Sequence, residues 1–164
     1  MTPKIIAHRG VTRNDQENTL PAFHQAFSEG ADGLEIDVRL SKDEKPIIFH
    51  DEDTSRLFDK NVITDLKKRF PNKLVFQSFH TLQIERYGIK KILEFYKKGN
   101  SDGLSIDIRD LSNKTIDKLL EKKIDLIIWT LNSMERLKEL SKKNIRAIIT
   151  DEVKDFADFL KRKA

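Results

Sequence analysis

The carboxyl-terminal part of the chain alternates between short apolar segments and amphipathic segments, and this alternation constrains the fold more than any other feature. The predicted strands and the helices that follow them are, in chain order, residues 103–108, 114–121, 125–131, 134–142, 147–150 and 153–160. Three consecutive strand-then-helix units of about twenty residues each require parallel strands joined by helical crossovers. The sequence therefore predicts an α/β fold.

The amino-terminal end begins with a unit of the same kind. Residues 5–7 form a short apolar strand, and the helix that follows ends at Gly30. A glycine is the usual residue just beyond a helix end. The apolar face of this helix consists of Leu20, Phe23 and Phe27.

Residues 33–40 and 46–49 form a different motif. The polar segment 41–45 between them is too short for a helical crossover, so the second strand must return antiparallel as a β-hairpin. A turn centred between Asp43 and Glu44 would place residue 37 opposite residue 50. We therefore predict a hairpin insertion at residues 33–50 that brings Asp37 close to His50.

Composition limits the class of protein. The 164 residues are enough for one domain with a core, and we expect a single domain over residues 1–164. The chain has no cysteine, which excludes a disulfide framework and thiolate metal sites. No apolar run approaches membrane-spanning length and no signal sequence is evident at the start. We expect a cytoplasmic protein without stable membrane insertion.

The chain is basic, with a net charge of +4 and a pI near 9.2. A basic chain can suit nucleic acid, an anionic membrane surface or a phosphate-bearing substrate. Its lysine pairs are spread along the sequence without interleaved aromatic residues, which argues against nucleic-acid binding. A small phosphate-bearing substrate is the partner that this pattern favours.

Two histidines follow directly after apolar strands. His8 and His50 each precede a charged residue, so both are expected at polar strand ends, where they could divide the proton transfers of a phosphodiester cleavage. Arg9 could bind two phosphoryl oxygens with its planar guanidinium, or form only a surface ion pair. His24 and His80 lack such neighbours, and we predict structural roles for them.

Glu35 and Asp37 alternate with aliphatic residues, so both carboxylates should project to the same side of the strand. Two such carboxylates repel each other unless a cation or a proton lies between them, and oxygen donors favour Mg²⁺ or Ca²⁺. A solvent-facing strand edge is the alternative. Asp107 could be a further ligand or only a capping group, and Trp129 could contact substrate or pack in the core.

At these residues the chain resembles the glycerophosphodiester phosphodiesterase family, part of the phospholipase-C-like phosphodiesterase superfamily. The similar segments are residues 6–10, 17–20, 22–23, 30–38, 46–51, 56–57, 77–79, 102–104, 129–132 and 148–151. The amino-terminal segments, which begin with His8-Arg9-Gly10, are the most specific. The resemblance covers most of the chain.

The resemblance implies a TIM-type (β/α) barrel and hydrolysis of glycerophosphodiesters to glycerol 3-phosphate and an alcohol. By resemblance, His8 and His50 are the acid–base pair and Arg9 holds the phosphate. Glu35 and Asp37 would bind the divalent cation, Mg²⁺ or Ca²⁺. Glu17 and Asn18 would organise the rim of the site, and Trp129 would border the glycerol pocket.

One family segment is missing from this chain. The family has a further strand with an Ile-Glu-x-Lys pattern, which supplies a third metal ligand and a phosphate contact, and nothing between Asp65 and Val75 matches it. The chain is also shorter than the roughly 200 to 250 residues of a complete barrel. We therefore expect an abbreviated barrel of about six or seven strands. Its open edge could be covered by residues 52–73 or by a second copy of the chain, as a homo-oligomer.

Two alternatives to this hydrolase remain open at the level of sequence. One is a sphingomyelinase-D-like lyase, which also pairs two histidines with strand carboxylates and would release a stable cyclic phosphate. The other is a degenerate barrel that binds phosphate-containing ligands with weak catalysis or none.

Overall fold

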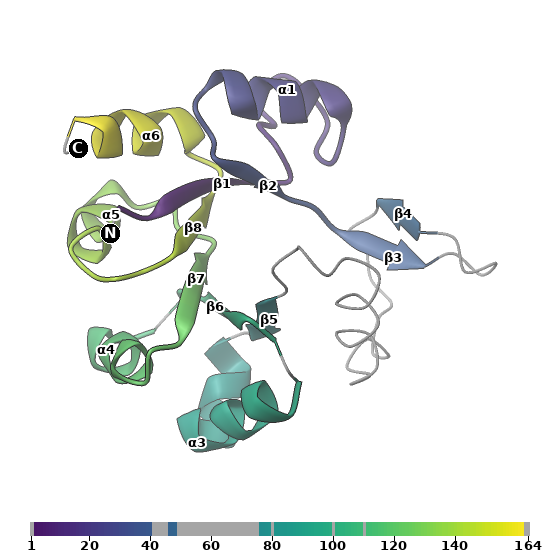
Figure 1. The fold of residues 1–164 in the computed structure, drawn as a ribbon. Coiled ribbons are helices and arrows are strands. Elements are labelled where there is room, and N and C mark those ends of the chain that lie inside the picture. Colours follow the sequence, from purple (N-terminus) through teal and green to yellow (C-terminus); the bar gives the residue numbers. More distant parts are fainter. Residues whose placement is uncertain are drawn as a thin grey trace. The chain divides into compact units, whose positions relative to one another are not determined.

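The computed structural model describes residues 2–40, 46–48, 76–79, 81–99, 101–109 and 111–162 (Figure 1). The chain forms two compact units. Unit 1 comprises Met1–Glu52 together with Thr130–Ala164, and unit 2 comprises Asp53–Trp129. Each unit contains parallel strands that are followed by helices.

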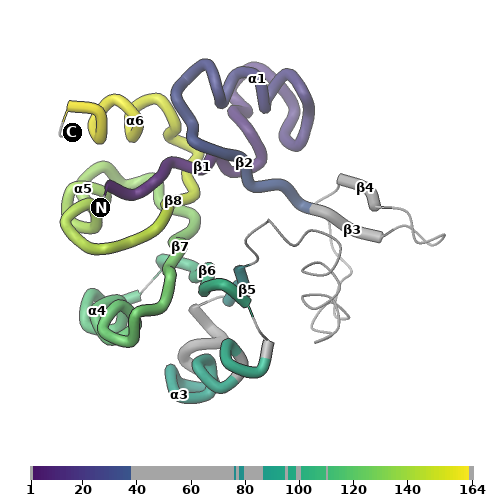
Figure 2. Tube along the Cα trace, in the orientation of Figure 1, coloured from purple at the N-terminus to yellow at the C-terminus, as the bar shows by residue number. Residues whose placement is uncertain are grey.

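Unit 1 contains three parallel strands in the order β2-β1-β8. Its elements are β1 (Lys4–His8), α1 (Leu20–Ser28), β2 (Gly33–Glu35), β3 (Val38–Leu40), β4 (Pro46–Ile48), α5 (Met134–Leu140), β8 (Ala147–Thr150) and α6 (Val153–Lys161). Helix α1 contacts β2 and helix α6 contacts β1 (Figure 1). The first strand and the last helix of the chain therefore lie against each other (Figure 2).

The alternation of side chains along β1 determines which face carries the site. Ile5 and Ala7 are 2% and 0% exposed, so they form the buried side of the strand. Successive strand residues point to opposite faces, and His8 therefore lies on the other face. Helix α6 contributes to the core with Val153, Phe156 and Leu160, as its apolar stripe predicts.

Helix α1 buries a different face from the one that its large apolar residues suggest. Leu20 and Phe27 are 71% and 52% exposed, whereas Ala22 and Ala26 are fully buried. The loop at Gly10 approaches the helix so closely that a Cβ added there would lie 2.8 Å from the Ala22 backbone. Only a small side chain fits at such a contact, which explains why Ala22 faces inward.

The predicted hairpin is present, but its first strand is divided and its register differs. Residues 33–40 form two strands: β2 pairs with β1, and β3 pairs antiparallel with β4. Val38 lies opposite Ile48, whereas the predicted register would place it opposite Phe49. Pairing Leu40 with Pro46 leaves an odd number of residues between the strands, and the prediction assumed an even number. His50 itself lies outside the described residues.

Unit 2 also contains three parallel strands among its described residues, in the order β7-β6-β5. Its elements are β5 (Phe76–Phe79), α3 (Thr81–Gly99), β6 (Gly103–Asp107), α4 (Asn113–Glu121) and β7 (Asp125–Trp129). Helix α3 is interrupted at Gly88, which has a φ of 72°. Leu104, Ile106, Leu126 and Ile128 are fully buried.

The carboxyl-terminal elements confirm the predicted strand–helix alternation, with bounds that differ by up to two residues. Ser112 and Ser133 explain where two helices begin, since each side chain accepts a hydrogen bond from the backbone N–H three residues later. The α/β fold class is thereby confirmed. In the part of the chain that the structure describes, no helix is long and apolar enough to cross a membrane.

Candidate active site

The carboxyl ends of the three parallel strands in unit 1 lie at the same level and carry polar residues. In the register between β1 and its neighbours, His8 lies beside Glu35 on one side, and Ala7 lies beside Thr150 on the other. The next residue after Thr150 is Asp151, which therefore reaches the level of His8. Parallel α/β sheets commonly bind ligands at this end.

His8 contacts Asp151 directly. The His8 Nδ1 atom lies 2.9 Å from Asp151 Oδ1, and the two residues are 143 positions apart in the chain. The hydrogen bond to Asp151 raises the pKa of His8 above its ordinary value, although burial opposes this shift. The same bond lowers the pKa of the Asp151 carboxyl. The contact therefore favours the ionised carboxylate and a proton on the imidazole.

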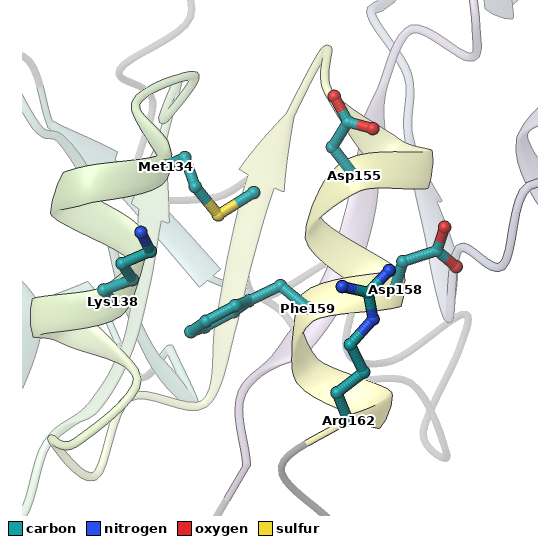
Figure 3. Close-up of a pocket in the computed structure, with 6 residues that line it drawn as sticks. All are labelled: Met134, Lys138, Asp155, Asp158, Phe159 and Arg162. Carbon is teal, nitrogen blue, oxygen red and sulfur yellow. The ribbon is translucent and has the colours of Figure 1, made fainter.

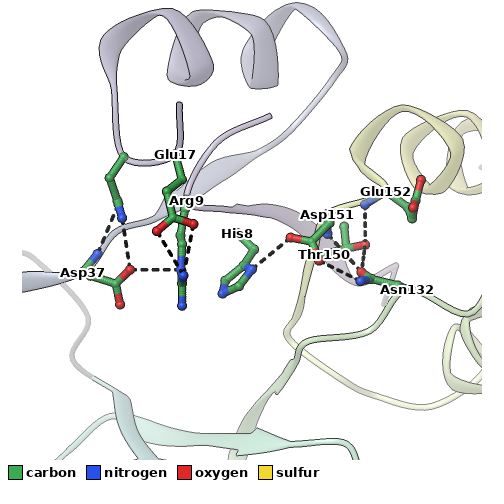
Figure 4. Close-up of polar contacts among 9 residues, drawn as sticks. His8, Arg9, Glu17, Asp37, Asn132, Thr150, Asp151 and Glu152 are labelled. Atoms are coloured by element: carbon green, nitrogen blue, oxygen red, sulfur yellow. Dashed lines mark hydrogen bonds and ion pairs between the residues drawn. The ribbon is translucent and has the colours of Figure 1, made fainter. Parts of the chain in front are cut away.

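Asn132 holds the other side of Asp151 (Figure 4). Its Nδ2 donates to Asp151 Oδ2 at 2.7 Å, and its Oδ1 accepts from the backbone N–H of Asp151 at 3.0 Å. The Thr150 hydroxyl also donates to Asn132 Oδ1, at 3.2 Å, and accepts from the Glu152 N–H. Both carboxylate oxygens of Asp151 thus have partners.

Arg9 lies beside His8 but is held by other residues (Figure 4). Its Nη1 donates to both carboxylate oxygens of Glu17 at 3.2 and 3.1 Å, and its Nε lies 3.0 Å from Asp37 Oδ2. The backbone of Arg9 has a φ of 58°, an uncommon conformation for a side-chain-bearing residue. Leaving the strand geometry in this way allows consecutive residues to point to the same side, and Figure 4 shows both side chains doing so.

Asn18 closes the loop that carries Arg9. Its backbone N–H donates to the Arg9 carbonyl at 2.9 Å, and its side chain both donates to the Asp37 carboxylate and accepts from the Asp37 N–H. Asn18 also has a positive φ, 59°, which asparagine tolerates better than most residues. It therefore connects the loop to Asp37, two residues beyond β2.

Gly10 allows this loop to lie against helix α1. It has a φ of 91°, and the next N–H, that of Val11, donates to the Ala22 carbonyl at 3.0 Å. A side chain at Gly10 would meet the backbone and the Cβ of Ala22. The positions of His8 and Arg9 therefore depend on the absence of a side chain at Gly10.

Glu35 carries a partly buried carboxylate. Burial raises the pKa of Glu35, and the nearby charge of Asp37 raises it further. Its Oε2 atom is buried and has no hydrogen-bond partner among the described residues. Such a pair of carboxylates suits a proton or a hard cation, and oxygen donors fit Mg²⁺ or Ca²⁺. Within the described ranges, no group of three or more His, Cys, Asp or Glu side chains could hold a metal ion.

The structure brings together six of the predicted site residues: His8, Arg9, Glu17, Asn18, Glu35 and Asp37. Trp129 ends β7 in unit 2, and His50 lies outside the described residues. Asp107, also in unit 2, is paired with Arg109 through both carboxylate oxygens. Sequence reasoning gave no role to Asp151 or Asn132, although a polar residue directly after β8, the neighbour of β1, was a signal that could have found Asp151.

A separate hollow of about 300 Å³ lies between helices α5 and α6 (Figure 3). Its lining residues are Met134, Lys138, Asp155, Asp158, Phe159 and Arg162. The charges are mixed, and none of these residues belongs to the cluster around His8 and Arg9. We assign it no part in the chemistry of that cluster.

The chain is similar to known proteins in sequence and in fold. Residues 8–69 match the model of the glycerophosphoryl diester phosphodiesterase family. A human lysophospholipase D is 31% identical over 153 residues, which are 86% of this chain and 49% of that protein. The chain spans about half of the length of the curated relatives that it matches, or less.

Solved structures share the fold. A glycerophosphodiester phosphodiesterase from Thermotoga maritima has a TM-score of 0.73 and 23% identity, with 97% of this chain and 99% of that chain covered. A phosphodiesterase from Oleispira antarctica, solved in complex with the product sn-glycerol-3-phosphate, also has a TM-score of 0.73, with 16% identity and 98% and 97% covered. The fold is thus that of the TIM-barrel phosphodiesterases, in an α/β chain of reduced length. The chain belongs to the glycerophosphodiester phosphodiesterase family.

Proposed function

We propose that this protein hydrolyses glycerophosphodiesters to glycerol 3-phosphate and an alcohol. The observation that carries the proposal is the adjacent pair His8 and Arg9, which share one side of a strand end inside the segment that matches the family. Cleavage of a phosphodiester needs a group that transfers protons and a cation that binds the phosphoryl oxygens, and an imidazole beside a guanidinium supplies both. The product complex of the related Oleispira antarctica enzyme supports the choice of substrate class.

In the proposed reaction, Arg9 binds the phosphoryl oxygens and His8 transfers a proton at Nε2, the nitrogen that does not face Asp151. The glycerol hydroxyl next to the phosphate attacks phosphorus and gives its proton to one histidine. The departing alkoxide takes a proton from the other. We propose His50 as this second histidine. Water then opens the cyclic phosphate, and the two histidines exchange roles.

We propose Glu35 and Asp37 as ligands of a divalent cation, Mg²⁺ or Ca²⁺. The support is the buried Oε2 of Glu35 together with the pKa shift that Asp37 contributes to. When bound, the cation would neutralise charge on the phosphoryl oxygens. Glu17 and Asn18 keep the role of organising the rim, because both hold Arg9 or its loop. Trp129 as a border of the glycerol pocket stays a prediction.

The test is release of glycerol 3-phosphate from glycerophosphocholine, with Mg²⁺, with Ca²⁺ and with a chelator. We expect release that depends on the cation and is lost in His8→Ala. A stable cyclic phosphate as the end product would indicate the lyase, which the family match does not favour. Binding of the diester without turnover, by folded protein, would indicate a degenerate barrel.

The resemblance to human lysophospholipase D adds a second substrate to the same assay. Lysophosphatidylcholine would be compared with glycerophosphocholine at equal concentration. Faster cleavage of the former would move the proposed substrate class to lysophospholipids without changing the assigned residues. A single domain, a cytoplasmic location, a homo-oligomer and the absence of nucleic-acid binding stay predictions.

A further inference from the structure

We propose that Asp151 is a positioning residue that keeps the proton of the neutral His8 ring on Nδ1, so that Nε2 is the atom that exchanges protons with substrate. The inference deepens the proposed function and rests on it for the identity of the reaction. It concerns residues to which sequence reasoning gave no role.

The chemistry of the two side chains sets the tautomer. An ionised carboxylate can only accept hydrogen bonds, so the 2.9 Å contact requires the proton to be on His8 Nδ1. A neutral imidazole carries one proton, and its Nε2 then has a free lone pair. Among the described residues, Nε2 has no hydrogen-bond partner, which leaves it available to a reacting hydroxyl.

Asp151 is itself held in one orientation. Asn132 donates a hydrogen bond to Asp151 Oδ2, and His8 Nδ1 donates one to Asp151 Oδ1. Rotation of the carboxylate would break both hydrogen bonds. The amide of Asn132 is in turn oriented by two donors, the Thr150 hydroxyl and the Asp151 N–H. A carboxylate held in this way orients the imidazole before substrate arrives, so the orientation need not be created during the reaction.

Stability alone does not explain this arrangement. The Asp151 side chain is 44% exposed, and ion pairs this accessible to water contribute little to folding. A metal-binding role is also a poor fit, because both carboxylate oxygens already have protein partners. Orientation of His8 is the effect that the contacts support.

The experiment is nitrogen NMR of the histidine side chains in ¹⁵N-labelled protein, recorded above the pKa of His8. The spectrum of His8→Gln identifies the His8 signals among the four histidines. Wild type should show the proton on Nδ1. Asp151→Asn can donate to Nδ1 from its amide and should move the proton to Nε2, whereas Asn132→Ala should give a mixture of both forms. Asp155→Asn makes the same chemical change on an exposed part of α6 and should leave the spectrum unchanged.

Kinetics provide the second readout. If Asp151 positions His8, Asp151→Asn should lower kcat by about 10- to 100-fold with little change in KM. A wild-type proton on Nε2, or a tautomer that does not change in folded Asp151→Asn, would overturn the inference even if the enzyme is active. The predicted tautomers in a protein without diesterase activity would instead leave the positioning intact and refute the proposed function.

Discussion

The two residues at the end of β1 are neighbours in sequence, yet the structure holds them in opposite ways. Among the described residues, His8 has one polar side-chain partner, Asp151, which comes from the far end of the chain and is held by an amide. Arg9 lies between two carboxylates, Glu17 and Asp37, which follow it by 8 and 28 residues in the same amino-terminal part of the chain. One residue is oriented through a single nitrogen, and the other is neutralised from two sides.

The difference fits the two chemical tasks that we propose for these residues. A proton-transfer group needs one nitrogen fixed and the other free, which the contact with Asp151 provides. An anion-binding group needs its charge and its planar shape, and local carboxylates can hold the guanidinium in place until phosphate competes for it. Variants on the His8 side should therefore act mainly on kcat, and variants on the Arg9 side mainly on KM.

The largest effect is expected from His8→Ala. Removing the proton-transfer group should lower kcat by about 10²- to 10⁴-fold while the fold persists. The measurement is glycerol 3-phosphate release at saturating substrate, with circular dichroism as the control for folding. An unchanged kcat in the folded variant would remove His8 from the proposed mechanism.

Arg9→Lys should have a smaller effect, and on a different constant. Lysine keeps the charge but loses the planar fork, so it cannot bind two phosphoryl oxygens as arginine does. Loss of one hydrogen bond between charged groups, about 1.5 to 3 kcal/mol, corresponds to about a 10- to 100-fold lower kcat/KM. We expect most of this in KM. A loss confined to kcat would erase the distinction between the two residues.

Variants of Asn18 test how much the loop that carries Arg9 contributes to the stability of the folded protein. Asn18→Gly loses the side-chain contacts with Asp37 but keeps the positive φ, and we expect a loss of about 1 kcal/mol in the free energy of unfolding. Asn18→Ala adds the cost of a left-handed backbone, about 1 kcal/mol more. Urea unfolding of both variants makes the comparison. Equal stabilities would show that the backbone conformation at residue 18 carries no cost.

The smallest expected effect is the pH dependence of the stability that the contact between His8 and Asp151 contributes. Since the pKa of His8 is raised in the folded protein, its contribution to stability is present below its unfolded pKa and disappears as the pH rises through the folded value. Since the pKa of Asp151 is lowered, its contribution is present above its unfolded pKa and disappears as the pH falls through the folded value. The pair should therefore stabilise most in the mildly acidic range between them.

Exposure limits the size of this effect. With Asp151 44% exposed, we expect less than about 1 kcal/mol between wild type and Asp151→Asn in that range, and a smaller difference in alkaline solution, where the contribution of His8 is lost and that of Asp151 remains. The charges of Glu35 and Arg9 also act on His8, in opposite directions, and both remain in the variant. Thermal unfolding as a function of pH measures the difference. A difference that grows at alkaline pH would contradict the assigned shifts.

The sequence predicted the features that depend on local interactions and missed those that depend on contacts between distant parts of the chain. Periodicity and turn residues are local, so the strands and helices after residue 100 were predicted within two residues. The polar residues near the amino terminus that the structure brings together were singled out because they follow strands. Asp151 was missed because its partner is 143 positions away, and only the register between β1 and β8 shows that they meet.

The errors have the same origin. The buried face of α1 differs from the face of its large apolar residues because the close approach of Gly10 to Ala22 is a tertiary contact. The hairpin register was wrong by one residue because the number of unpaired turn residues cannot be read from their polarity. Each error concerns a packing constraint that no local pattern carries.

Gly10 also affects how mutational data on this chain should be interpreted. In a saturation scan scored by activity, position 10 should tolerate as few substitutions as position 8, because every other residue would push the loop away from Ala22 and displace both neighbours. Such a scan would mark Gly10 as functionally essential, although its own atoms have no chemistry to offer. A second scan, scored by protein abundance, separates a structural role from a chemical one. In that scan Gly10 variants should be depleted and His8 variants should not.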